Sequence, residues 1–218
     1  MKMLFATIQR FKYKFGFDRK NFILRYIKSN RCKHILEIGV FNGSFAERLL
    51  KTASKSSPNS RVYYLGIDLF AEGLTQEKYL EEVSLYPKTR MEVQRKLSKF
   101  GNAQVELIQG DSTIVVPLIS NNLKFDVIHI DGGHSFATVQ KDWLNIAKVM
   151  DSRTAVFFDD YSNDRGVTKG GFGIKAVVDG IDPTKYKVEL SKNPDYFWKP
   201  YGLLSLKMAR LTIRSEEN

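Results

Sequence analysis

Short apolar runs alternate with amphipathic stretches along most of the chain, and this alternation predicts the fold. Seven runs have the length and the β-branched or aromatic content of strands: 34–39, 62–68, 105–109, 125–131, 155–159, 186–190 and 203–208. Helical character links the first five of them, most clearly over 44–53, 76–100 and 136–150. Strands that alternate with helices indicate an α/β fold with a mostly parallel sheet and helices on both faces.

The last two strand candidates are joined differently from the others. The segment between them reads SKNPDYFWKP over residues 191–200, a polar and aromatic loop with no room for a crossover helix. Because parallel neighbours need such a crossover, these two strands are expected to pair antiparallel. The pattern therefore predicts seven strands, of which the last is antiparallel.

Length and composition place the chain among single-domain proteins. It has 218 residues with 43% apolar content, enough for one α/β core. Its one cysteine, Cys32, excludes an intrachain disulfide and a cysteine-based zinc cluster, and fits a small core residue. Charges interrupt every apolar stretch, so we expect no membrane-spanning helix, no signal peptide and a cytoplasmic location.

The net charge of +10 is concentrated at the N-terminus. Residues 1–34 carry ten Lys or Arg and one acid, whereas the remainder carries 24 basic and 23 acidic residues. Helical spacing from Leu4 to Phe15, with Asp18 as a candidate cap for a helix over 19–29, predicts a basic amphipathic arm over 1–30 and a domain over 31–218. The arm packs on the domain or on a second copy of the chain, or else contacts an anionic membrane or nucleic acid.

A glycine turn follows the first predicted strand. Residues 35–50 read ILEIGVFNGSFAERLL, in which Glu37 ends the apolar run and Gly39 and Gly43 flank a tight turn before an amphipathic helix. Such turns at strand carboxyl ends bind nucleotide-like ligands. A NAD-binding turn would show G-x-G-x-x-G for a pyrophosphate. The spacing G-x-x-x-G after a carboxylate suits a cationic ligand without phosphate better.

Acidic residues end the later strands as well. Asp131 follows the fourth strand, and Asp159 and Asp160 end the fifth. Strands four and five are expected at the middle of the sheet, so these three carboxylates would face one small volume and repel each other. A divalent cation with oxygen ligands, most simply Mg²⁺, would resolve this repulsion. In the alternative, Asp159 or Asp160 only caps a turn and no metal binds.

The first turn resembles motif I of the class I S-adenosylmethionine-dependent methyltransferases. The likeness extends over about residues 35–161, and the pattern resembles the catechol and caffeoyl-CoA O-methyltransferases and related sugar O-methyltransferases. It implies a Rossmann-like methyltransferase fold that binds S-adenosylmethionine. The residues that it assigns to the cofactor are Glu37, Gly39, Phe41, Gly43, Asp68, Asp111 and Ser112.

Each of these residues has an expected role in the resemblance. The glycines admit the methionine moiety, with Phe41 where many methyltransferases carry a third glycine, and Glu37 contacts the ammonium group through water. Asp68, at the end of the second strand, accepts from both ribose hydroxyls. Asp111, after the third strand, accepts from the adenine amino group, and Ser112 contacts the ring edge.

The resemblance also implies the reaction centre. Those families hold a metal on an Asp after strand four and an acidic or Asp-Asn pair after strand five, here Asp131, Asp159 and Asp160. They place a basic catalytic residue three positions after the first metal ligand, here His134. We expect Asp131 and His134 to be catalytic, with His134 as the general base. Alternatively, His134 caps the following helix or binds a carboxylate.

The sequence thus predicts an S-adenosylmethionine-dependent O-methyltransferase that acts on a small hydroxylated molecule, such as a sugar, a natural product or a catechol. Alternatives are a metal-independent small-molecule enzyme, a nucleic-acid methyltransferase that uses the arm, and a non-catalytic scaffold. Homo-oligomerisation through the arm is a further expectation. His129 is expected to be buried and hydrogen-bonded, and His34 has no assigned role.

Three further segments have candidate roles. Residues 71–100, split by Pro87, form either a wall over the cofactor or a solvated insertion. The glycine-rich segment after strand five is either a substrate gate or a plain surface loop. Aromatic residues that could line an acceptor pocket, or belong to the core, are Tyr161, Phe197, Trp198 and Tyr201.

Overall fold

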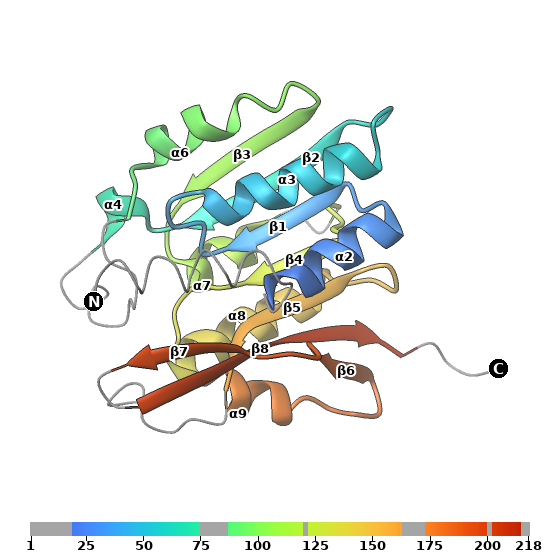
Figure 1. The fold of residues 1–218 in the computed structure, drawn as a ribbon, viewed down its shortest axis with the longest axis vertical. Helices are drawn as coiled ribbons and strands as arrows, with labels where there is room; N and C mark the ends of the chain where they lie inside the picture. Colours follow the sequence, from blue (N-terminus) through green and yellow to red (C-terminus); the bar gives the residue numbers. More distant parts are fainter. Residues whose placement is uncertain (1–18, 75–86, 120–121, 163–172, 200–201, 215–218) are drawn as a thin grey trace.

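The computed structural model describes residues 19–74, 87–119, 122–162, 173–199 and 202–214. Its centre is an eight-stranded sheet in the order β3-β2-β1-β4-β5-β8-β6, with β7 paired to β8 (Figure 1). Strands β1 to β5 are parallel, and β8 is antiparallel to its three neighbours. The strands are β1 (His34–Ile38), β2 (Val62–Asp68), β3 (Ala103–Gln109), β4 (Val127–Ile130), β5 (Ala155–Tyr161), β6 (Tyr186–Leu190), β7 (Asp195–Lys199) and β8 (Gly202–Ile213).

The predicted fold class is confirmed, with one correction to the strand count. The segment predicted as a loop over 191–200 contains β7, which pairs with the first part of β8. This is possible because β8 is twice as long as the predicted run over 203–208. Its second part pairs with β5 and β6, as predicted for the antiparallel end of the sheet.

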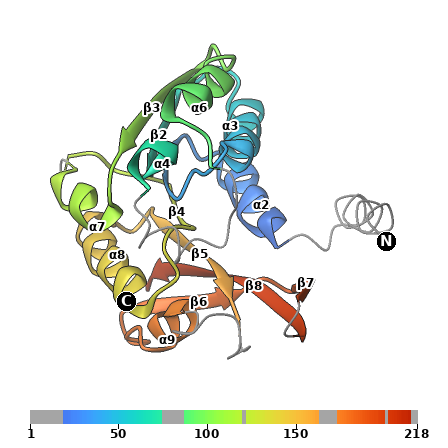
Figure 2. The ribbon, with the colours of Figure 1, turned by 90° about the vertical axis from the view of Figure 1, so that its left-hand side faces the viewer.

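Helices cover both faces of the sheet. Figure 2 shows α2 and α3 on one face and α7 and α8 on the other. The helices are α2 (Lys20–Asn30), α3 (Ser44–Ser56), α4 (Phe70–Gly73), α6 (Arg90–Leu97), α7 (Ser112–Val115), the 3₁₀ turn η1 (Val116–Leu118), α8 (Phe136–Val149) and α9 (Gly173–Asp179). None of the helices within these described ranges has the length and apolar character that a bilayer span requires.

Helix α2 belongs to the packing of the domain. Ile23 and Ile27, one turn apart, are fully buried, and the rings of Phe22 and Tyr26 meet Phe157 edge-on. The helix predicted over 19–29 is therefore present and packs on the sheet. Residues 1–18 of the predicted arm, including the candidate cap Asp18, lie outside the described residues, as do residues 75–86 of the predicted 71–100 segment.

Alternation along the strands assigns side chains to the two faces. In β1, Leu36 and Ile38 join the core under α8, whereas Ile35 joins the core under α2 and α3. Glu37 lies on the same face as Ile35 by this alternation. In β4 and β5 the same face carries Val127 and Phe157. Side chains two positions further along each strand lie on that face as well, at the carboxyl ends of the strands.

Candidate active site

A pocket lies at the carboxyl ends of β1, β2, β3 and β4. Four of the residues predicted to bind a cofactor line it, namely Gly39, Asp68, Asp111 and Ser112. Gly110, Gly132 and Gly133 also form part of its wall. The pocket thus lies at the edge of the sheet where α/β folds bind nucleotide-like ligands.

The glycines of the first turn are required by packing of the protein itself. Gly39 has φ +87°, and a Cβ there would lie 2.0 Å from the carbonyl oxygen of Asp131. Gly43 has φ +70°, and its Cβ would lie 2.9 Å from Cγ1 of Val93 on α6. The turn after β1 thus presses against the loop after β4, which brings the pocket predicted to bind the cofactor next to the predicted reaction centre.

Hydrogen bonds to Asp68 hold this turn against the end of β2. Its Oδ2 accepts hydrogen bonds from the N–H groups of Val40 (2.6 Å) and Phe41 (2.7 Å), and Oδ1 accepts from Phe70 N–H (2.6 Å). Burial raises the pKa of Asp68, and the three N–H donors oppose that rise. Phe41 has φ +53°, so these bonds hold a left-handed residue where a glycine is common. The predicted ribose contact of Asp68 stays a prediction.

Asp111 caps the helix after β3. Its Oδ1 accepts from the N–H (3.0 Å) and the hydroxyl (2.8 Å) of Thr113, which starts α7 beside the pocket. The assignment of Asp111 and Ser112 to the adenine ring is compatible with this position and stays a prediction.

Glu37 lies outside the pocket lining. Its carboxylate is 1% exposed, accepts from the Tyr64 hydroxyl through Oε2, and lies 3.1 Å from His129 Nδ1 through Oε1. His129 is fully buried, as predicted. Both oxygens of Glu37 thus have partners within the protein, and the water-mediated contact to a cofactor stays a prediction.

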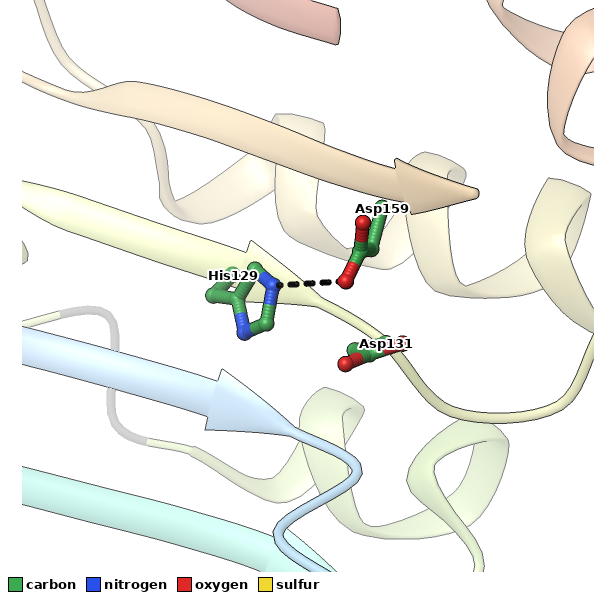
Figure 3. Close-up of side chains that lie close together, drawn as sticks. All are labelled: His129, Asp131 and Asp159. Carbon is green, nitrogen blue, oxygen red and sulfur yellow. Dashed lines mark ion pairs between the residues drawn. The ribbon is translucent and has the colours of Figure 1, made fainter. Parts of the chain in front are cut away.

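Next to His129, the ends of β4 and β5 bring the predicted acids together. Ligand atoms of His129, Asp131 and Asp159 lie within 4.8 Å of one another (Figure 3). Those of Asp131, His134 and Asp160 lie equally close together. Asp160 has φ +56°, and the pairing of β5 with β8 shifts register between Phe158 and Tyr161. This irregularity turns Asp160 toward the same cluster as Asp159, although neighbours in a regular strand face opposite ways.

Two cations that the sequence reasoning missed contact all three acids. Arg19 donates from Nε to Asp159 Oδ1 (2.5 Å) and from its terminal nitrogen to Asp160 Oδ1. Lys20 Nζ lies 2.9 Å from Asp131 Oδ2 and 3.2 Å from Asp159 Oδ2. Both residues stand at the beginning of α2, and the sequence reasoning counted them only as part of a basic arm.

A fourth acid, on β7, completes the surroundings of Arg19. Asp195 accepts from the Arg19 backbone N–H (3.1 Å) through Oδ1 and from the guanidinium (3.3 Å) through Oδ2. The ring of Phe197 lies 5.6 Å from the guanidinium carbon. The correction of the loop to a strand therefore adds a residue to the site.

These contacts set the charges of the cluster. Burial alone would raise the pKa of Asp159, but the charges of Arg19 and Lys20 outweigh it and lower that pKa. Burial raises the pKa of Asp131, against the opposing effect of Lys20. The pKa values of Arg19 and Lys20 are raised, because the carboxylates outweigh their burial. Both cations therefore stay charged.

His134 pairs with an acid of the cluster. Its Nε2 lies 3.1 Å from Asp160 Oδ2. Burial lowers the pKa of His134, but this hydrogen bond and the charges of Asp160, Asp131 and Asp159 together outweigh burial and raise that pKa. The cap of α8 is the hydroxyl of Ser135, which accepts from Thr138 N–H. Of the alternatives for His134, the structure thus shows binding to a carboxylate and assigns the capping role to its neighbour.

The aromatic residues considered for an acceptor pocket lie apart. The Tyr161 hydroxyl donates to Asp179 on α9 (2.9 Å), whereas Phe197 lies beside Arg19. Tyr201, the side chain of Trp198 and residues 163–172 of the predicted gate lie outside the described residues.

The carboxylates of the cluster suit a hard metal cation. The position between Asp131 and Asp159, however, already holds the ammonium group of Lys20. Carboxylate oxygens of Asp131 and Asp159 are ligands that Mg²⁺ prefers. The same two oxygens bind the Lys20 ammonium, and Asp160 contacts both Arg19 and His134. In this arrangement a metal ion bridging Asp131 and Asp159 does not fit beside Lys20.

The sheet order, the pocket at the ends of β1 to β4 and the acids beyond it define a class I methyltransferase. Residues 36–161, more than half of the chain, match the protein family described as methyltransferase domain. The chain belongs to this family and is an S-adenosylmethionine-dependent methyltransferase. No curated protein matches it.

Solved structures with the same fold are distant in sequence. The O-methyltransferase TomG of Streptomyces achromogenes, in complex with S-adenosylmethionine, is 13% identical with a TM-score of 0.60, over 88% of this chain and 79% of that one. A Staphylococcus aureus protein described as a caffeoyl-CoA O-methyltransferase is 16% identical with a TM-score of 0.61, over 90% and 82%. A Bacillus cereus O-methyltransferase, in complex with S-adenosylhomocysteine, is 16% identical with a TM-score of 0.59, over 89% and 80%.

Proposed function

We propose that this methyltransferase methylates a hydroxyl group of a small molecule, such as a sugar, a natural product or a catechol. The observation that carries the proposal is the contact between His134 Nε2 and Asp160 Oδ2 at the edge of the pocket. Gly132 and Gly133 line that pocket, and His134 is the next residue. An imidazole at this point is a suitable base for an alcohol.

The pocket fits a cationic donor with ribose hydroxyls. Asp68 and Asp111 supply acidic groups at its wall, and glycine backbone supplies close approach. When bound, S-adenosylmethionine supplies an electrophilic methyl group on a sulfonium. Gly39, Asp68, Asp111 and Ser112 are the residues that we assign to it.

His134 removes the proton of the acceptor hydroxyl in this proposal. An alkyl hydroxyl is almost wholly protonated at neutral pH, so a positioned base increases its nucleophilicity. Asp160 orients the imidazole and stabilises its protonated form. Asp131, beside His134, is assigned to the placement of the hydroxyl.

A metal-assisted version of the same reaction is the second candidate. It is favoured by the two groups of donors around Asp131, whose atoms lie within 4.8 Å of one another. Mg²⁺ on Asp131, Asp159 and Asp160 stays a prediction: it would have to displace the Lys20 ammonium, and proton transfer to His134 does not require it. Activity in EDTA, with and without added Mg²⁺, separates the two versions.

Methylation of nucleic acid is less well supported. Two of the basic residues that suggested it, Arg19 and Lys20, are paired with carboxylates of the domain. RNA binding that disappears on deletion of residues 1–18 would favour it. Assembly of copies through the arm stays a prediction, for which size-exclusion chromatography with light scattering is the measurement.

The test of the main proposal is methyl transfer from labelled S-adenosylmethionine to a set of sugars, catechols and other alcohols. His134→Gln is expected to lower kcat/KM by at least about 100-fold, the usual contribution of a general base. His34→Gln is the matched control, because His34 is exposed at the opposite end of β1. Equal rates for the two variants, or transfer to amines only, would contradict the proposal.

A further inference from the structure

The beginning of α2 places two cations against the carboxyl ends of β4 and β5. Arg19 and Lys20 together contact Asp131 after β4, Asp159 on β5 and other carboxylates of the cluster. Asp159 is 1% exposed, so its charge requires a partner. On the basis of the function proposed above, we propose that Lys20, anchored by Arg19, supplies the positive charge at the reaction centre in place of a divalent metal ion.

Position is the first support. Lys20 Nζ lies between Asp131 Oδ2 at 2.9 Å and Asp159 Oδ2 at 3.2 Å. A metal ion on these two oxygens would sit about 2.1 Å from each and would compete with the ammonium for the same lone pairs. Two cations at such a short separation also repel each other. One of them has to be absent.

Anchoring is the second support. Arg19 is 8% exposed and binds Asp159, Asp160 and Asp195, the last through both its backbone N–H and its guanidinium. Buried Ile23, one turn further along α2, holds the same helix on the sheet. These contacts fix the Lys20 backbone on both sides. Moving the Lys20 ammonium out of the cluster would break its ion pairs with Asp131 and Asp159.

Access is the third support. The Lys20 side chain is 22% exposed, compared with 9% for Arg19, and Nζ lies 4.4 Å from the centre of the Phe45 ring. Asp131, its partner, immediately precedes the pocket residues Gly132 and Gly133. A hydroxyl that reaches Asp131 from the pocket therefore meets the ammonium as well.

The chemistry balances without a metal. In this proposal the hydroxyl proton moves to His134 Nδ1, because Nε2 donates its own proton to Asp160. The Lys20 ammonium stabilises the developing alkoxide without giving up a proton. The oxygen forms a bond to the methyl carbon, and the carbon–sulfur bond breaks with its electron pair remaining on sulfur. The products are the methyl ether, S-adenosylhomocysteine and a proton that His134 releases to solvent.

Binding of Mn²⁺, followed by electron paramagnetic resonance, tests this assignment without any acceptor. Wild-type protein loaded with S-adenosylhomocysteine is expected to show no saturable Mn²⁺ binding. Lys20→Gln is expected to bind Mn²⁺, because the two carboxylates lose their ammonium partner. Lys28→Gln is the matched control, since Lys28 is an exposed residue on the same helix and its replacement removes the same charge.

Activity gives a second readout. Wild-type methyl transfer is expected to be unchanged in EDTA, and Lys20→Gln is expected to lose about 100-fold in kcat, the usual effect of removing one electrostatic stabiliser. Lys20→Arg, which keeps the charge, is expected to retain part of the rate. Circular dichroism and S-adenosylhomocysteine affinity verify that each variant is folded.

Two results would overturn the inference: saturable Mn²⁺ binding by the wild type that Asp131→Asn abolishes, or a wild-type rate for Lys20→Gln. Failure of the proposed function is a separate result, namely no methyl transfer to any alcohol. In that event the Mn²⁺ spectrum of the wild type still decides which cation the acids hold.

Discussion

The two halves of the proposed active site, a cofactor half and an acceptor half, are built in different ways. The cofactor half, at the carboxyl ends of β1, β2 and β3, is held by backbone groups, such as the three N–H groups that donate to Asp68. The acceptor half, at the carboxyl ends of β4 and β5 and the start of β7, is a cluster of side-chain charges from distant segments. Arg19 and Asp159 are 140 residues apart in sequence, and Arg19 and Asp195 are 176 apart.

This difference has energetic consequences. Backbone contacts at glycine turns depend on shape, so any added atom disturbs them, whatever its charge. Buried charges depend on partners, because removal of one partner leaves another charge uncompensated at a cost of about 3–5 kcal/mol. The cofactor half should therefore respond to size, and the acceptor half to charge.

The largest expected effect is in the cofactor half. Gly39→Ala puts a Cβ 2.0 Å from the Asp131 carbonyl oxygen at φ +87°. Strain of the backbone and overpacking together are expected to destabilise the fold by about 3–5 kcal/mol, measured by urea unfolding, and to abolish binding of S-adenosylhomocysteine in calorimetry.

Gly101→Ala is the control for that experiment, because a Cβ at Gly101 meets nothing within 4 Å. Its stability should stay within about 0.5 kcal/mol of the wild type, as for most surface substitutions. A Gly39→Ala protein with wild-type stability would show that the turn and the β4 loop are not pressed together.

The sequence predicted the cofactor half well because its signals are local. The apolar run of β1, the glycines after it and the acids that end β2 and β3 each lie within a few residues of the element that they define. Parallel strands then bring their carboxyl ends to one edge of the sheet, which places Gly39, Asp68 and Asp111 in one pocket.

The acceptor half was predicted only in part. Asp131, Asp159 and Asp160 follow strands and were found, but the partner of a charge carries no periodic signal in the sequence. In the sequence, Arg19 and Lys20 are two more cations of a basic segment. The rest of the chain is nearly neutral, so its charge does not indicate that it needs these two cations as partners in its interior.

Strand β7 was missed for a related reason. Asp195–Lys199 contains five residues between turn-forming segments, and its sequence predicts part of a loop, since its pairing depends on the extra length of β8. Asp195 could be recognised as part of the cluster only after that pairing was known.

A smaller effect is expected from Asp68→Ala. This change removes the acceptor of three backbone N–H groups and should cost about 2 kcal/mol of stability and at least about tenfold in S-adenosylhomocysteine affinity. The KM for the acceptor should stay close to that of the wild type. Asp182→Ala, which removes an exposed acid that caps its own turn, is the comparison. An equal loss of affinity in both variants would remove Asp68 from the cofactor half.

The smallest expected effect concerns the charge of the acceptor half. The hydrogen bond with Asp160 raises the pKa of His134 against its burial. A base acts in its neutral form, so kcat/KM should rise with pH through this raised pKa. Asp160→Asn weakens that bond and should move this rising part of the pH profile to lower pH, with a smaller change in rate at neutral pH than His134→Gln causes. Asp195→Asn is the comparison, because Asp195 contacts Arg19, whereas His134 contacts Asp160. The charges that act on His134 are those of Asp160, Asp131 and Asp159, so the pH profile of Asp195→Asn should move less. If the two variants shift the pH dependence of kcat/KM equally, the acceptor half responds to its total charge and not to the pair His134–Asp160.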